Sequence, residues 1–153
     1  MVDVGNLQLE IQSIADFVEP EIPNIEFHLQ HMPETYETNE ISIELVQSKP
    51  ATETAYHYRI NRTFQLVYFG TSKLDCMSKM QIIERKLCDK QLIPLGQTGR
   101  YLRIASFSLS QAFRTETTGV CAIIGMLEAE IREARTQVIH EKINVVDTST
   151  TVN

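Results

Sequence analysis

Apolar and polar residues alternate along the chain with two periods, one typical of helices and one typical of strands. The first apolar stripe recurs at steps of three and four residues, which predicts an amphipathic helix. Its positions are Val4, Leu7, Ile11, Ile14 and Val18. Asp3 is the expected N-cap of this helix and Pro20 its expected stop.

Alternation with a period of two predicts three strands in the first half of the chain. They cover residues 25–30, 41–45 and 56–69, and in the third the arginine Arg62 interrupts an otherwise apolar face. Polar segments at 32–39 and 48–54 separate the strands. We expect both segments to be loops, the second a mobile one around Pro50.

The second half begins with a helix and continues as a hairpin. Ser72 and Asp75 resemble a capping box at the start of a helix whose apolar side carries Cys76, Met80, Ile83 and Leu87. After Leu92–Pro94 and a glycine loop at 96–99, the pattern predicts a strand over 101–109, a turn at 117–119 and a returning strand over 120–126.

The pattern beyond Met126 fits two structures. Leu127, Ile131, Ala134 and Val138 have helical spacing, whereas Leu127, Ala129 and Ile131 have the spacing of a strand. The charged residues of 128–135 favour a helix by propensity, and a strand would extend the hairpin. Residues 147–153 are polar, so we expect a flexible C-terminal tail after a single domain over 1–146.

Composition is that of a globular domain. A chain of 153 residues with 42% hydrophobic residues can bury a core without metal or disulfide support. It contains no apolar run long enough for a membrane span and no secretory signal, so we expect a soluble protein that folds in the cytoplasm. Cys76, Cys88 and Cys121 lie among apolar neighbours and are expected to be reduced core residues.

Charge is distributed unevenly along the sequence. Residues 1–55 hold eleven acidic side chains and one lysine, a net charge of −10, whereas residues 56–153 hold thirteen bases and nine acids, a net charge of +4. Opposite charge on two parts of one fold suits a head-to-tail contact between identical copies, which closes into rings or continues as filaments. Surface charge that serves only solubility is the simpler interpretation.

Motifs of enzymes and metal proteins are missing from the sequence. The four histidines lack the spacing of metal ligands, and His28 and His57 alternate with apolar residues as surface imidazoles do. No nucleophile signature or phosphate-binding glycine motif is present. We therefore expect no enzymatic activity, no cofactor and no metal.

Basic and aromatic residues interleave along the predicted strands. They are Arg59, Arg62, Arg100, Arg103 and Arg114 with Tyr58, Phe64, Tyr101, Phe107 and Phe113. A sheet that binds nucleic acid could be built from such residues. The acidic sequence pI of about 5.2 argues against this function, because nucleic-acid binders usually carry a basic surplus.

Several segments in order resemble the tail terminator (tail completion) family of Gram-positive phages and defective prophages. They are Tyr58 to Phe69, the helix to Leu87, Arg100-Tyr101-Leu102-Arg103, Phe113 to Glu116, and Gly125 to Arg135. The resemblance implies an α+β fold, a central and mostly antiparallel sheet with an N-terminal and a middle helix packed on one face. It also implies a strand, not a helix, up to about Ile131.

The same resemblance implies a structural virion protein located in the neck region of the tail. Such a subunit forms a hexameric ring on the tail tube, stops tube polymerisation, and contacts the major tail tube protein and a head-completion or neck protein. DNA would pass through the lumen without specific binding. Another neck connector subunit is the alternative within the same class.

Interface-forming residue types suggest which side chains a ring would use. Arg59, Arg62, Arg103 and Arg114 are expected partners for Glu26, Glu40, Glu44 or Glu53 of a neighbouring copy, and Tyr58, Tyr101, Phe107 and Phe113 are expected to supply apolar contact. Pairing of these arginines with glutamates of their own chain is the equally weighted alternative. The loops at 32–39 and 48–55 are the expected contacts to the tube.

Overall fold

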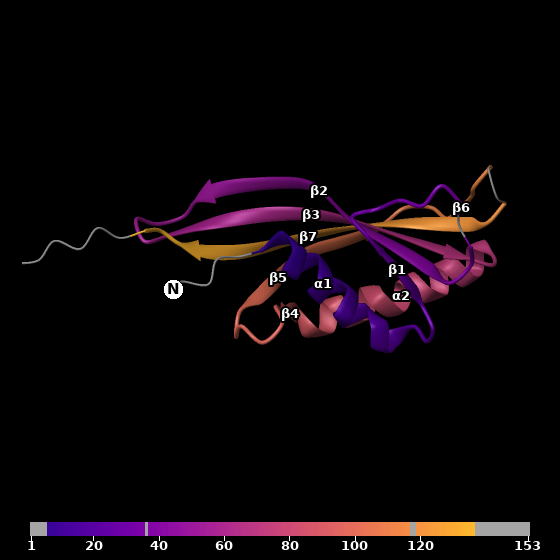
Figure 1. The fold of residues 1–153 in the computed structure, drawn as a ribbon, viewed down its shortest axis with the longest axis horizontal. Coiled ribbons are helices and arrows are strands. Elements are labelled where there is room, and N and C mark those ends of the chain that lie inside the picture. The colour runs from indigo at the N-terminus through magenta and orange to yellow at the C-terminus, as the bar shows by residue number, and fades with distance from the viewer. Residues whose placement is uncertain (1–5, 36, 117–118, 137–153) are drawn as a thin grey trace, which may run out of the picture.

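A computed structural model of the chain describes residues 6–35, 37–116 and 119–136. One curved seven-stranded sheet forms the body, with two helices packed on the same face (Figure 1). The strand order is β1-β2-β3-β7-β5-β4, with β6 also paired to β7, and among these described strands only the β1–β2 pair is parallel. This confirms the expected α+β class and the placement of both helices.

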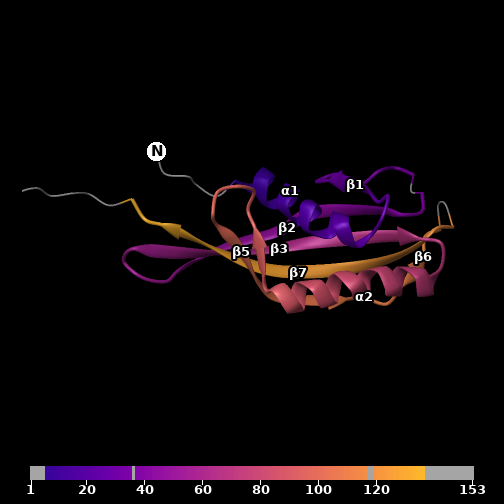
Figure 2. The same cartoon turned by 90° about the horizontal axis from the view of Figure 1, so that it is seen from below.

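The elements follow one another in a simple order. They are α1 (Leu7–Val18), the short 3-10 helix η1 (Glu19–Glu21), β1 (Glu26–Leu29), β2 (Glu40–Thr52), β3 (His57–Gly70), α2 (Lys73–Lys90), β4 (Leu92–Pro94), β5 (Tyr101–Leu109), β6 (Phe113–Arg114) and β7 (Cys121–Ala134). Seen from below, both helices lie in front of the sheet (Figure 2), where α1 packs against β1, β2 and β4, and α2 packs against β3, β5 and β7.

The start of α1 differs from the sequence prediction. Its N-cap is Asn6, whose side-chain oxygen accepts a hydrogen bond from the Gln8 backbone N–H at 2.9 Å. The expected cap Asp3 lies outside the described residues. At the other end the prediction is confirmed, because α1 stops at Val18 and Pro20 falls in η1.

The second helix forms as its sequence predicts. Ser72 is the N-cap and its hydroxyl accepts a hydrogen bond from the Asp75 backbone N–H at 3.1 Å. The expected apolar side is buried against the sheet: Cys76, Met80, Ile83 and Leu87 are each at most 1% exposed. Gln91 ends the helix in a left-handed conformation, with its N–H bonded to the Leu87 carbonyl.

The longest pairing in the sheet joins β3 to β7. It runs without interruption from His57 opposite Ala134 to Gly70 opposite Cys121. Alternate residues Leu127, Ala129 and Ile131 of β7 face the helix-covered side and are buried there. The strand implied by the resemblance is therefore confirmed and extends to Ala134, while the helical propensity of this segment is overridden by pairing with β3.

The expected mobile loop at 48–54 is wrong for most of its length. Residues up to Thr52 continue β2, which pairs with β3 as far as Thr52 opposite Tyr58 after a bulge near Val46. Pro50 fits because β1 pairs only with Glu40–Ile43, which leaves β2 as an edge strand at the proline. The resulting hairpin end, residues 46–60, projects beyond the helices (Figure 1) and is called the arm below.

Arg62, which interrupts the apolar face of β3, is buried. Its guanidinium donates to both carboxylate oxygens of Glu10 in α1, at 3.1 and 3.2 Å, and also to the Ser48 hydroxyl. The Glu10 side chain is 0% exposed and that of Arg62 9%. A second link between α1 and its surroundings is Lys86 of α2, which donates to the Phe17 carbonyl at 2.7 Å and pairs with Glu21.

The three cysteines are free, but they are not alike. Cys76 and Cys121 are buried as expected, whereas Cys88 is exposed, which corrects the prediction. Burial raises the pKa of the Cys76 thiol to about 11, and burial likewise holds the pKa of the Tyr68 hydroxyl above its usual range. The Cys76 thiol donates to the Cys121 carbonyl at 3.3 Å.

Replacing Arg62 with alanine leaves the Glu10 carboxylate buried without its cation. We expect Arg62→Ala to lower the free energy of unfolding by about 3–5 kcal/mol, because removal of one partner of a buried ion pair leaves an uncompensated charge. Urea denaturation followed by circular dichroism measures this loss. The exposed Lys49→Ala is the control, and equal small effects of both substitutions would contradict the ion-pair assignment.

Exposure and pKa together predict a difference in thiol reactivity. At pH 8 we expect one cysteine, Cys88, to react rapidly with a disulfide reagent such as DTNB, while Cys76 and Cys121 react only after unfolding. Mass spectrometry of the labelled peptides identifies the site. Rapid labelling of Cys76 in the folded protein would contradict the burial of the α2–sheet contact.

Candidate subunit interface

The two flanks of the sheet carry opposite charge. The acidic flank, residues 6–53, forms α1, η1, β1 and β2 and holds ten acidic side chains and one lysine, a net charge of −9. The basic flank, residues 73–116, forms α2, β4, β5 and β6 and holds eight bases and four acids, a net charge of +4. Because β1 and β4 end the strand order, the uneven charge of the sequence becomes a difference between the two edges of the sheet. On the helix-covered face the two flanks meet, where α1 packs against β4 and Lys86 of α2 bonds to the Phe17 carbonyl.

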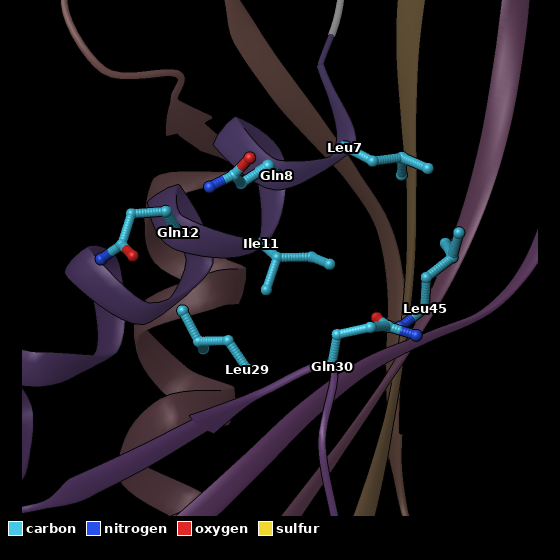
Figure 3. Close-up of a pocket in the computed structure, with 7 residues that line it drawn as sticks. All are labelled: Leu7, Gln8, Ile11, Gln12, Leu29, Gln30 and Leu45. Atoms are coloured by element: carbon cyan, nitrogen blue, oxygen red, sulfur yellow. The ribbon is translucent and has the colours of Figure 1, made fainter.

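An apolar groove lies on the acidic flank between α1, the end of β1 and the middle of β2. Its lining residues are Leu7, Gln8, Ile11, Gln12, Leu29, Gln30 and Leu45, drawn in Figure 3, and its volume is about 490 Å³. Four of these side chains are aliphatic, and three glutamines supply the polar groups. Gln30 is tied to β2, because its side-chain oxygen accepts a hydrogen bond from the Leu45 N–H at 2.9 Å.

A second groove, of about 340 Å³, lies on the basic flank between α2 and the β5–β6 connection. Leu74 and Met77 of α2 line it, and their side chains are 72% and 52% exposed. Leu109 and Ala112 form part of the opposite wall. Large apolar side chains at such exposure favour a contact surface over an ordinary wet helix face.

On both flanks, part of an outer strand edge has no strand paired with it. On the acidic flank, β1 pairs with β2 only along Glu40–Ile43, and on the basic flank β4 pairs with β5 only along Tyr101–Arg103. Within the described residues, the outer edges of 46–52 and 105–109 therefore have no strand beside them. Uncovered edges offer backbone hydrogen-bonding groups to another chain.

Two of the predicted interface arginines lie together on the sheet face opposite the helices. The guanidinium groups of Arg59 and Arg103 approach the Glu130 carboxylate at 3.7 and 3.5 Å. Arg132 on the same face pairs with Glu53 at 3.0 Å. These contacts lie within one chain. In the single subunit, Arg59, Arg103 and Glu53 therefore pair with residues of their own chain, which was the alternative to pairing with a neighbouring copy. The carboxylates of Glu130 and Glu53 limit any basic character of this face.

Two other predicted interface residues are buried inside the subunit. Arg62 is held by Glu10, as described above, and Glu40 is 6% exposed and bonded to the His28 imidazole at 2.7 Å. Neither side chain is presented to a neighbouring copy in this structure. Glu26 is exposed and Glu44 half-buried, both on the acidic flank.

The predicted aromatic residues divide between surface and core. Tyr101 and Phe113 are 51% and 40% exposed on the basic flank, and Arg114 beside Phe113 is also exposed. Phe107 packs partly against the core, and Tyr58 is half-buried under the Arg135 guanidinium, 5.6 Å from its ring centroid. Tyr101, Phe113, Arg114 and Arg103, whose side chain is 65% exposed beside Glu130, are thus the predicted residues of this flank that remain accessible.

Sequence reasoning did not identify the exposed apolar residues of α2. Leu74, Met77 and Ile82 lie off the buried stripe of that helix, and a helical projection of residues 73–90 contains this signal. It also did not identify Glu130, which becomes a partner of two arginines only through strand pairing.

One set of possible metal ligands occurs among the described residues. Glu26, His28 and Glu40 each offer a ligand atom, and these atoms lie within 4.8 Å of one another. The sequence predicted a surface role for His28, whereas the structure places its ring half-buried against Glu40. In the described part of the chain, no helix is long and apolar enough to cross a membrane.

Comparisons with known proteins give little further information. No protein-family model matches the sequence, and a search of curated proteins finds no match. The structure is similar to a chain from a solved structure described as the virion of a native gene transfer agent (GTA) particle, with a TM-score of 0.40 and 8% sequence identity. The similarity covers 78% of this chain and 92% of that chain. At that TM-score the similarity carries no argument about fold or function.

Proposed function

We propose that this protein is a non-enzymatic structural subunit of a phage tail terminator, which forms a hexameric ring on the head-proximal end of the tail tube. The ring stops polymerisation of the tube and offers a surface for head joining. The proposal rests on the ordered resemblance of the sequence segments to that family and on one structural observation: two flanks of opposite charge, each with an apolar groove and an uncovered strand edge.

The opposite flanks support a head-to-tail contact. A contact between two different surfaces of one chain is heterologous, and repeated rotation closes such contacts into a ring. With net charges of −9 and +4, the acidic flank of one copy attracts the basic flank of the next. Exposed Leu74, Met77 and Phe113 on the basic flank supply apolar area, which opposite charge alone does not provide.

Placement of both helices on one sheet face supports a channel. In a closed ring every copy turns the same sheet face toward the axis. The helix-covered face would then line one side of the ring, and the uncovered sheet face the other side. That uncovered face carries paired charges, such as Arg59 and Arg103 with Glu130 and Arg132 with Glu53. A polar surface of balanced charge suits a lumen through which DNA passes without sticking.

The mass of the protein in solution, and the change of that mass in variants with altered charge, test the proposed ring. We expect light scattering to find a hexamer, or a monomer that becomes a ring when the cognate tube protein is added. Arg114→Glu should weaken this self-association at least about tenfold, since it places a like charge opposite the acidic flank. Lys49→Glu is the matched comparison: it changes net charge equally, but it adds negative charge to the acidic flank, so it should preserve or strengthen association with the basic flank.

A chain that stays monomeric with tube protein would contradict the proposal, as would equal effects of the two charge reversals. A neck connector, the alternative within the virion, is separated by electron microscopy of phage tails assembled without this protein. Loss of a terminator gives overlong tubes, whereas loss of a connector leaves tubes of normal length without heads.

A nucleic-acid-binding sheet is the alternative from another class. Arg59, Arg103 and Arg132 lie on the uncovered face, which favours it, but each is within ion-pair distance of a glutamate of the same chain. We therefore expect no salt-dependent retention on single-stranded DNA, measured by a filter or column assay at low salt. Strong retention that falls with added salt would favour the binding module over the ring.

A further inference from the structure

Parallel pairing of β1 with β2 brings three polar side chains together on the acidic flank. The register places Glu26 opposite Glu40 and His28 opposite Ser42. Because side chains of a strand alternate between its two faces, Glu26 and His28 share a face. Glu40 joins them from the neighbouring strand, and ligand atoms of all three lie within 4.8 Å of one another.

We infer that Glu26, His28 and Glu40 bind a divalent first-row transition metal ion, such as Mn²⁺ or Zn²⁺. Two carboxylate oxygens and one imidazole nitrogen form a donor set that these ions accept, with water completing the coordination. Metal–ligand distances are about 2.0–2.2 Å, so small rotations of the side chains bring the present atoms to bonding distance. This inference does not depend on the proposed ring.

Two of the ligands are already held in place. The Glu40 side chain is largely buried, and its Oε2 accepts a hydrogen bond from the Glu37 N–H at 2.7 Å. Its Oε1 lies 2.7 Å from His28 Nε2. An ion would replace this direct contact with a shared metal, while the backbone bond continues to orient the carboxylate, as outer partners do in metal sites.

The histidine distinguishes this set from an ordinary patch of surface acids. The described part of the acidic flank holds ten carboxylates, yet only Glu26 and Glu40 converge with an imidazole. These two carboxylates lie side by side on neighbouring strands, where their like charges repel. A cation between them removes that repulsion and joins β1, which is paired through only four residues, more firmly to β2.

Titration of the full chain with MnCl2 after removal of metals by EDTA tests the site. Mn²⁺ is the first probe because exposed Cys88 can capture Zn²⁺, whereas manganese prefers oxygen and nitrogen ligands. We expect binding of one ion per chain by calorimetry and a higher melting temperature, because an ion that binds only the folded state stabilises it. Paramagnetic broadening in NMR spectra should centre on residues 26–28 and 40.

Glu26→Gln is the decisive variant. The Glu26 side chain is exposed and makes no hydrogen bond or ion pair with the described residues, so its loss should not unfold the protein. We expect Mn²⁺ affinity to fall at least about tenfold, as loss of metal-site groups generally produces. Glu19→Gln, an exposed acid in η1, is the matched control and should bind as the unaltered protein does.

Zinc extends the test in a Cys88→Ser background, where His28→Asn should abolish binding and His57→Asn should not. Circular dichroism confirms that each variant is folded. Equal Mn²⁺ affinities of Glu26→Gln and Glu19→Gln would overturn the inference, and so would broadening centred elsewhere or no binding at all. A ring that binds no metal would contradict the metal site and leave the proposed function unaffected. A chain that stays monomeric but binds metal would support the metal site and contradict the proposed function.

Discussion

The uninterrupted pairing of β3 with β7 is the constraint on which the rest of the structure depends. Fourteen residue pairs join the two strands, from the arm to the turn before α2. The helices cover only part of this length, so the core ends near Ile60 and Ile131 and the arm continues without a helix beneath it. Length mismatch between sheet and helices therefore produces the elongated shape.

The Glu10–Arg62 pair lies where the covered core gives way to the arm. An unpaired Arg62 would place an uncompensated positive charge inside the subunit, and an unpaired Glu10 would place an uncompensated negative charge there. Each satisfies the other, which fixes the rotation of α1 over the sheet. The apolar groove of the acidic flank follows from that rotation, since Leu7 and Ile11 of the same helix form one of its walls.

Charge separation and strand order act together on the surface. The acidic N-terminal third forms one side of the sheet, and α2 with β4, β5 and β6 forms the other. A chain with the same composition but interleaved strands would have mixed these charges. The two flanks thus differ in charge because segments adjacent in the sequence remain adjacent in the sheet, apart from the insertion of β7 between β3 and β5.

Local sequence by itself determined the elements with strong local signals. The apolar spacing of α1, the Ser72 cap of α2 and the alternation of β3 each require only interactions between near neighbours in the chain. The tertiary structure decided the state of 127–134, the strand at 48–52, and the partners of Arg62, Glu40 and His28. These features depend on contacts between residues far apart in the sequence. The energy of such contacts outweighs local propensity, and no local sequence pattern shows which distant residues will pair.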